Sequence, residues 1–257
     1  MEKPKAEKQA VTAEASHGFG SAWRVIFNAV GIFILSQIIA AFTVGIIAAV
    51  INPGEPTTTI FDNSISAQFF YVLIAEGTAA GAVLWLVKRQ KMNFGAIGLG
   101  RKPLLRDLGW AAGGMVAFYI LAILTSYLLS LFISQGELDK SQDIGFNNLT
   151  TAIDHILAFL SLVIIPPLGE EILVRGYLYS GLRKAWRFVP AMLVTSFLFG
   201  LAHLDGGIGG SVVWAAAADT FMLSLVLVYV REHTGALYAG MLIHAANNLI
   251  AYSVHFK

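Results

Sequence analysis

The sequence predicts an all-α fold, a polytopic membrane bundle of seven or eight transmembrane helices. The chain has 257 residues, of which 56% are hydrophobic and only 13% charged, and its mean hydropathy is +0.69. Soluble domains carry roughly 25% charged residues, so this composition indicates a membrane protein. A net charge of +1 gives no reason to expect nucleic-acid binding. The absence of cysteine excludes disulfides, thiol nucleophiles and thiolate metal sites.

Seven apolar segments supply the predicted spans, because a membrane helix needs about 20 mostly apolar residues. The fourth segment contains Pro166-Pro167, which remove two backbone donors and predict a break in the helix, with a restart near Leu168. That break and the short fifth segment leave open an eighth span or a re-entrant piece. The seven segments are Ala22–Ile51, Ala67–Val87, Leu108–Ser134, Ile153–Leu182, Val189–His203, Val212–Val230 and Ala236–Val254.

Charged residues outside the spans predict domain organisation and orientation. Residues 1–22 are polar, lack a signal-peptide cleavage site, and are expected to form a disordered cytoplasmic tail. If the spans alternate, the lysines and arginines outside them face the side of this tail, except Lys140 and Lys257, so the N-terminus is predicted to be cytoplasmic. Residues 23–150 would form N-terminal transmembrane helices, and residues 151–257 a helical core. Few loop insertions favour a prokaryotic cell membrane.

The fourth span holds three ionisable residues, Glu170, Glu171 and Arg175. Charges in hydrocarbon cost at least about 2.5 kcal/mol each, so a functional reason for them is expected. Glu171 and Arg175 are four residues apart, share one helix face and can pair. Glu170 lies about 100° round the helix from Glu171. We therefore interpret Glu170 as the chemical carboxylate and Glu171–Arg175 as the structural pair that orients it. The competing interpretation is a buried ion cluster that only ties helices together.

Two later spans place further polar residues inside the bundle. Phe199 and His203 share one face of the fifth span, and His244 and Asn248 share one face of the seventh. With Glu170 these groups suit amide hydrolysis at a catalytic site within the bundle. The carboxylate would act as general base on a water that His203 helps to place. His244 and Asn248 would donate hydrogen bonds to the developing oxyanion.

A zinc-dependent version uses the same side chains. Glu170, His203 and His244, with a water, would form a metal set of one carboxylate and two imidazoles. The His-Glu-x-x-His motif is absent, so the chain is not a standard zincin. The residues themselves do not choose between zinc and no cofactor.

Three motifs, in the order in which they occur, resemble those of a known family. They are Glu-Glu-x-x-x-Arg at 170–175, Phe-x-x-x-His at 199–203 and His-x-x-x-Asn at 244–248. It is the CPBP family of CAAX proteases and bacteriocin-processing enzymes, also called Abi, which includes CAAX prenyl protease 2. The resemblance covers roughly Leu157 to Ala251. It implies an intramembrane endopeptidase, in a family described both as metalloproteases and as metal-independent glutamate proteases. It also implies a catalytic set of Glu170, His203, His244 and Asn248, which Glu171 and Arg175 support.

The resemblance further implies a peptide or protein substrate, with a lipid-modified C-terminal tail as one option, contact with membrane lipid, and no nucleic acid. Two other classes stay open. One is a non-catalytic scaffold or immunity protein of the same fold. The other is a small proton-coupled transporter that uses Glu170, Glu76 or Asp219 as a relay. Glu76 is expected either as a buried hydrogen-bond partner or in a cavity wall, and Asp219 mainly as a structural residue.

Overall fold

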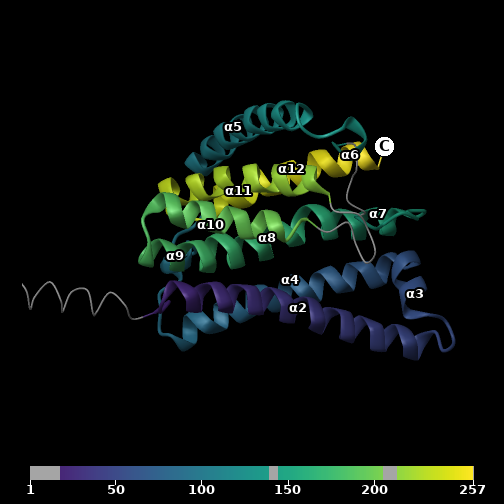
Figure 1. The fold of residues 1–257 in the computed structure, drawn as a ribbon. Helices are drawn as coiled ribbons and strands as arrows, with labels where there is room; N and C mark the ends of the chain where they lie inside the picture. Colours follow the sequence, from purple (N-terminus) through teal and green to yellow (C-terminus); the bar gives the residue numbers. More distant parts are fainter. Residues whose placement is uncertain (1–17, 139–143, 205–212, 257) are drawn as a thin grey trace, which may run out of the picture.

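The structure, a computed structural model, describes residues 18–138, 144–204 and 213–256. These residues form helices and connecting turns, with no strand among them. The all-helical bundle predicted from the sequence is therefore confirmed (Figure 1). Most of the predicted tail over residues 1–22 lies outside the described residues, as do Lys140 and Lys257.

The predicted spans correspond to seven helical passages in the described part of the chain. Five of them are long and apolar enough to cross a membrane: α2, α4, α5, the continuous stretch α7–α9, and α11. The element bounds are α2 Ala22–Ile51, α3 Thr57–Asn63, α4 Ile65–Arg89, η1 Phe94–Ile97, α5 Leu105–Ser130, α6 Gln135–Leu138, α7 Ala152–Phe159, η2 Leu160–Ile164, α8 Ile165–Glu170, η3 Glu171–Tyr179, α9 Ser180–Ala185, α10 Phe188–Leu201, α11 Trp214–Thr234 and α12 Tyr238–His255.

The two remaining passages are α10 and α12. With 14 residues, α10 is about 21 Å long at a rise of 1.5 Å per residue, which is less than the roughly 30 Å of a hydrocarbon core. The 18 residues of α12 carry the polar residues of the His-x-x-x-Asn motif. Part of each helix is buried in the bundle, including the polar residues Thr195 and Ser196 of α10 and His244 of α12.

The predicted break at Pro166-Pro167 is wrong. The chain is helical without interruption from Ala152 to Ala185. The prolines lie in the first turn of α8, directly after the π-helical segment η2. A proline ring clashes with the carbonyl four residues earlier in a regular α-helix, whereas the wider π turn, with its i→i+5 hydrogen bonds, leaves room for it. A second π-helical segment, η3, carries Glu171 and Arg175.

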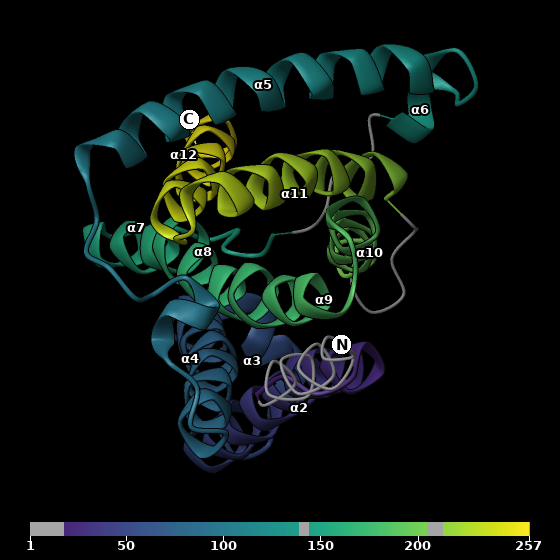
Figure 2. The same ribbon diagram turned by 90° about the vertical axis from the view of Figure 1, so that its left-hand side faces the viewer.

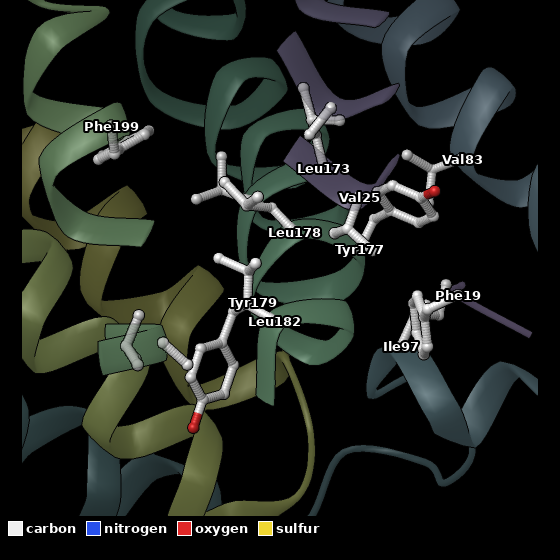
Figure 3. Packing of buried hydrophobic residues seen from close by; sticks show 14 of the residues in the cluster. Phe19, Val25, Val83, Ile97, Leu173, Tyr177, Leu178, Tyr179, Leu182 and Phe199 are labelled. Carbon is white, nitrogen blue, oxygen red and sulfur yellow. The ribbon is translucent and has the colours of Figure 1, made fainter. Parts of the chain in front are cut away.

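The helices form three layers, which both ribbon views show (Figures 1 and 2). Helices α2, α3 and α4 lie on one side, and α11 and α12 on the other, with α5 outermost beyond them. The α7–α9 passage and α10 lie between these layers. Segment η3 is therefore enclosed by helices from both sides. The largest core cluster surrounds it (Figure 3) and includes Phe19, Val25, Val83, Ile97, Leu173, Tyr177, Leu178, Tyr179, Leu182 and Phe199.

Gly181 sets the distance between α9 and α2. A Cβ atom at this position would lie 2.7 Å from both Cγ atoms of Val25 and 3.0 Å from the Phe19 ring. We expect Gly181→Ala to lower the free energy of unfolding in detergent by about 1–3 kcal/mol, because the added methyl group overpacks this contact. Gly31→Ala is the matched control. No atom lies within 4 Å of its added Cβ, so only the roughly 1 kcal/mol gain in helix propensity remains. If both substitutions changed the free energy of unfolding equally, the close packing of α9 against α2 at Gly181 would be contradicted.

Candidate active site

The centre of the site is a buried ion pair within η3. Nη1 of Arg175 donates to Oε1 of Glu171 at 2.8 Å, and both residues have 0% exposed surface. The pair predicted from the i,i+4 spacing is thus present. Because neither charge reaches solvent, each depends on the other and on the surrounding polar and aromatic groups for its stability.

The other face of Arg175 is covered by an aromatic ring. Its guanidinium carbon lies 4.2 Å from the centroid of the Phe199 ring on α10, in cation–π contact. The same ring lies 4.8 Å from the imidazole of His203 and 5.9 Å from that of His244, between centroids. The sequence predicted that Phe199 shares a face with His203 and belongs to the second motif, but not that it contacts Arg175. The ring in fact links the three motifs, and its place in the second motif was the available signal.

His244 connects α12 to both glutamates. Its Nδ1 lies 3.3 Å from Oε1 of Glu171, and its Nε2 lies 3.7 Å from Oε2 of Glu170. One turn earlier in α12, a Cβ atom at Gly240 would come within 3.0 Å of the Glu171 carboxylate. The absence of a side chain there lets α12 approach closely enough for this contact. Glu171 thus fixes the ring orientation, and the second ring nitrogen faces Glu170.

Asn248 is held by the backbone of the fourth passage. Its Nδ2 donates to the carbonyl oxygen of Leu162 at 2.9 Å. In a helix, this carbonyl would accept a hydrogen bond from the backbone N–H four residues later in an α turn, or five residues later in a π turn. These positions are Pro166 and Pro167, and proline has no backbone N–H. A buried carbonyl without a donor is costly, so the side chain of Asn248 replaces the missing helix bond. An amide NH₂ has two N–H groups, so one remains for a further acceptor.

His203 lies just beyond the C-terminal end of α10. Its Nδ1 is 2.9 Å from the carbonyl oxygen of Phe199, one turn earlier in the chain. This contact orients the ring, which lines a cavity beside Glu170. Its position at a helix end agrees with the short fifth span expected from the sequence.

A cavity of about 450 Å³ adjoins this cluster and is mostly apolar. Its walls come from α2, α4, the α8–η3 stretch and α10. Glu170, His203 and Glu76 lie in these walls, which also include Ser36, Gln37, Phe33, Ile34, Leu173, Leu198, Phe199 and Leu201. Of the two roles expected for Glu76, the structure therefore supports the cavity wall. Asp219, on α11, is half-buried and is not among the lining residues.

The candidate residues do not all converge on one point. Glu170, Glu171, Arg175 and His244 form one cluster, whereas His203 contacts the Phe199 ring and Asn248 bonds to the Leu162 carbonyl. Within the described residues, no three histidine, aspartate or glutamate side chains are grouped so that they could hold a metal ion. The arrangement thus does not fit the zinc set of Glu170, His203 and His244, and no step below uses a metal. Oε2 of Glu170 is buried and has no hydrogen-bond partner among the residues that the structure describes.

Comparison with known proteins agrees with the motif analysis. Residues 152–250 match the family model described as Type II CAAX prenyl endopeptidase Rce1-like, which confirms the predicted resemblance over this segment. An "Uncharacterized 24.3 kDa protein" of Escherichia coli is 29% identical over 148 residues, 54% of this chain and 61% of that protein, so the match spans less than two thirds of its length. "UPF0177 protein YxdF" of Lactococcus lactis is 24% identical over 151 residues, 58% of this chain and 77% of that protein. No solved structure matches.

Removal of one partner of the buried pair should destabilise the protein strongly. We expect Arg175→Leu or Glu171→Leu to lower the free energy of unfolding by about 3–5 kcal/mol, because a buried charge loses its partner. The double substitution should cost clearly less than the sum of the two. Unfolding in mixed detergent micelles measures all three proteins.

The control is a pair exposed at the end of the bundle, Arg183 and Glu232. Nε of Arg183 lies 2.9 Å from Oε1 of Glu232, but the side chains are 40% and 28% exposed. The two single substitutions and the double substitution at this pair should therefore show a coupling energy below about 1 kcal/mol. Additive effects at Glu171 and Arg175 would show that the pair is not the stabilising unit.

Proposed function

We propose that this chain is an intramembrane endopeptidase that hydrolyses a peptide bond with a water activated by Glu170. One observation carries the proposal. Glu170 has a buried carboxylate oxygen without a hydrogen-bond partner in the described part of the chain, lines the same cavity as His203, and lies beside the second ring nitrogen of His244. A carboxylate placed in this way can take a proton from a bound water in a cavity that also admits a substrate.

The proposed reaction gives each of the four candidate residues a role. Glu170 takes a proton from a water that His203 helps to place, and the resulting hydroxide attacks the scissile carbonyl carbon. The tetrahedral intermediate carries a negative oxygen, which hydrogen bonds from His244 and Asn248 would stabilise. Glu170 then gives the proton to the leaving amine as the C–N bond breaks. Water is consumed and the two peptide fragments are released, so no cofactor is needed for balance.

The cavity walls support an apolar substrate segment. Phe33 and Ile34 of α2 and Leu198 of α10 line this cavity together with Glu76 and Glu170. Such a cavity suits either a lipid-modified C-terminal tail of the CAAX type or an apolar segment of a peptide precursor or membrane protein. The match to the Rce1-like model over residues 152–250 favours the tail. With the N-terminus in the cytoplasm, as the basic residues predict, the substrate would come from the cytoplasmic leaflet of a prokaryotic membrane.

The substitution Glu170→Gln tests whether Glu170 is the general base. The amide keeps the shape of the side chain but cannot accept a proton, so hydrolysis should fall by about 100-fold or more, since general-base catalysis typically contributes that much. Cleavage of quenched-fluorescent peptides with a CAAX-like C-terminus, prenylated and unmodified, by purified protein in proteoliposomes measures the rate. The thermal midpoint should stay close to that of the wild type, because Glu170 is outside the ion pair. Undiminished cleavage by this variant would remove Glu170 from the mechanism.

The geometry also predicts independence from metal ions. Because the three candidate donors are not grouped as ligands, exhaustive chelation should leave the rate of peptide cleavage unchanged. Elemental analysis of the active protein should find less than one zinc per ten chains, roughly a background level. Loss of activity on chelation, with recovery on adding Zn²⁺, would show that the side chains rearrange around a metal during turnover.

A further inference from the structure

One neutral polar side chain in the cavity wall has no part in the reaction described above. Gln37 lies on α2 and lines the same cavity as Glu170 and His203. Its neighbour Ser36 also lines this cavity, but the Ser36 hydroxyl donates to the carbonyl oxygen of Phe33 at 2.8 Å and is satisfied within α2. The side-chain amide of Gln37 bonds instead to a group outside its own helix.

That group is a tyrosine on the neighbouring helix. Tyr71 of α4 donates its hydroxyl hydrogen to Oε1 of Gln37 at 2.6 Å. The Tyr71 ring packs edge-on against Phe61 of α3, with 5.4 Å between the ring centroids. Helices α2, α3 and α4 belong to one layer (Figures 1 and 2). Tyr71 is not among the residues that line the cavity, so it holds the amide from within this layer.

The bond from Tyr71 fixes which end of the amide is left for another partner. A glutamine amide has an accepting oxygen and an NH₂ group with two donors. Because Tyr71 bonds to the oxygen, the two N–H groups of Nε2 point away from it. No residue in the described part of the chain accepts a hydrogen bond from Nε2, and this atom is not fully buried. An oxygen acceptor that enters the cavity would therefore satisfy these donors.

The charges of the cavity wall decide which acceptor fits. Two carboxyl groups, Glu76 and Glu170, line the cavity, and no lysine or arginine of the described residues does so. A substrate carboxylate in this mostly apolar cavity would lose hydration and meet acids rather than a cation. A hydrocarbon tail has no acceptor to offer. The backbone carbonyl of a peptide is neutral and accepts hydrogen bonds from N–H groups, so it suits this neutral donor.

We propose that Gln37 is a substrate-binding residue whose Nε2 donates a hydrogen bond to a backbone carbonyl of the peptide. Tyr71 is the positioning residue that holds the amide in this orientation. The inference rests on the proposed function, which supplies a peptide to the cavity. Both residues lie outside the segment 152–250 that matches the Rce1-like model. The N-terminal helices thus contribute to recognition of the substrate, and the matched segment carries the proposed chemistry.

The substitution Gln37→Met tests the donor, because it keeps the length of the side chain and removes both N–H groups. It should raise KM for a prenylated, quenched-fluorescent CAAX-like peptide in proteoliposomes about three- to tenfold, the effect of one neutral hydrogen bond. Because the bond is made equally in the ground state and the transition state, kcat should stay within about twofold of the wild type. Tyr71→Phe releases the amide and should raise KM by a smaller factor of about two, again with kcat unchanged.

The matched control is a second hydrogen bond between an amide and a tyrosine on α2. Nδ2 of Asn28 donates to the Tyr177 hydroxyl at 2.9 Å, and neither residue lines the cavity. Asn28→Leu should lower the thermal midpoint, as Gln37→Met should, but leave KM unchanged. An equal rise in KM in both variants would show a general effect of loosening α2 and would overturn the proposal. An unchanged KM in Gln37→Met would also overturn it.

Equilibrium binding tests the contact without cleavage, in proteins that carry Glu170→Gln with either Gln37 or Gln37→Met. The peptides carry a trans-alkene in place of one peptide bond at a time, which removes the carbonyl and the N–H of that bond. One of these peptides should bind both proteins equally, whereas the others should bind the Gln37→Met protein about three- to tenfold more weakly. An ester at the same bond keeps the carbonyl and removes the N–H, so the difference between the proteins should return.

The binding results separate this inference from the proposed function. If Glu170→Gln still cleaves peptides, or if the wild type cleaves none, the assignment of the base is wrong. The difference in affinity between the two proteins would still support the role of Gln37. Equal affinities for every peptide, or no binding of peptide by either protein, would overturn the inference. A difference that the ester abolishes would show that the amide accepts from a peptide N–H, and would overturn the donor role.

Discussion

A guanidinium with no exposed surface is the constraint on which the rest of the site depends. Arg175 lies in the middle layer of the bundle, and its charge is balanced by Glu171 one turn away. The Phe199 ring covers it from α10, and His244 reaches the same carboxylate from α12. Three helical segments, η3, α10 and α12, thus meet around one charge. Each of the three motifs supplies a contact to this group or to its counterion, which explains why they occur together.

The helix that carries the ion pair is irregular at the site itself. Two π-helical segments in the described residues, η2 and η3, flank the turn that ends at Glu170. Such segments are rare and occur mostly at functional sites. The wider turns admit Pro166 and Pro167 and leave the Leu162 carbonyl without a helix donor, and Asn248 supplies one. The structure therefore gives Asn248 a structural role as the partner of η2.

Much of this could be predicted from the sequence, and the failures have physical reasons. The spans follow from long apolar runs, and the Glu171–Arg175 pair follows from a spacing of four, which still joins the two groups in a π turn. The break at Pro166 was wrong because the rule for proline describes regular α-helices, and a π turn removes the clash. The proximity of Glu76 to Glu170 could not be foreseen, since it depends on how α4 packs against Gly169. The catalytic roles of Glu170, His203, His244 and Asn248 remain predictions.

The spacing within η3 also bears on how the chain enters the bilayer. Arg175 and its counterion belong to the same helical turn, whereas His244 belongs to α12 and is synthesised about 70 residues later, at roughly 5–20 residues per second. The nascent fourth passage therefore carries its own neutralising charge and can insert before its later partners exist. α12 then arrives to a segment already in place, and its docking supplies His244 and Asn248 together. Assembly of the candidate site is thus coupled to the insertion of α12.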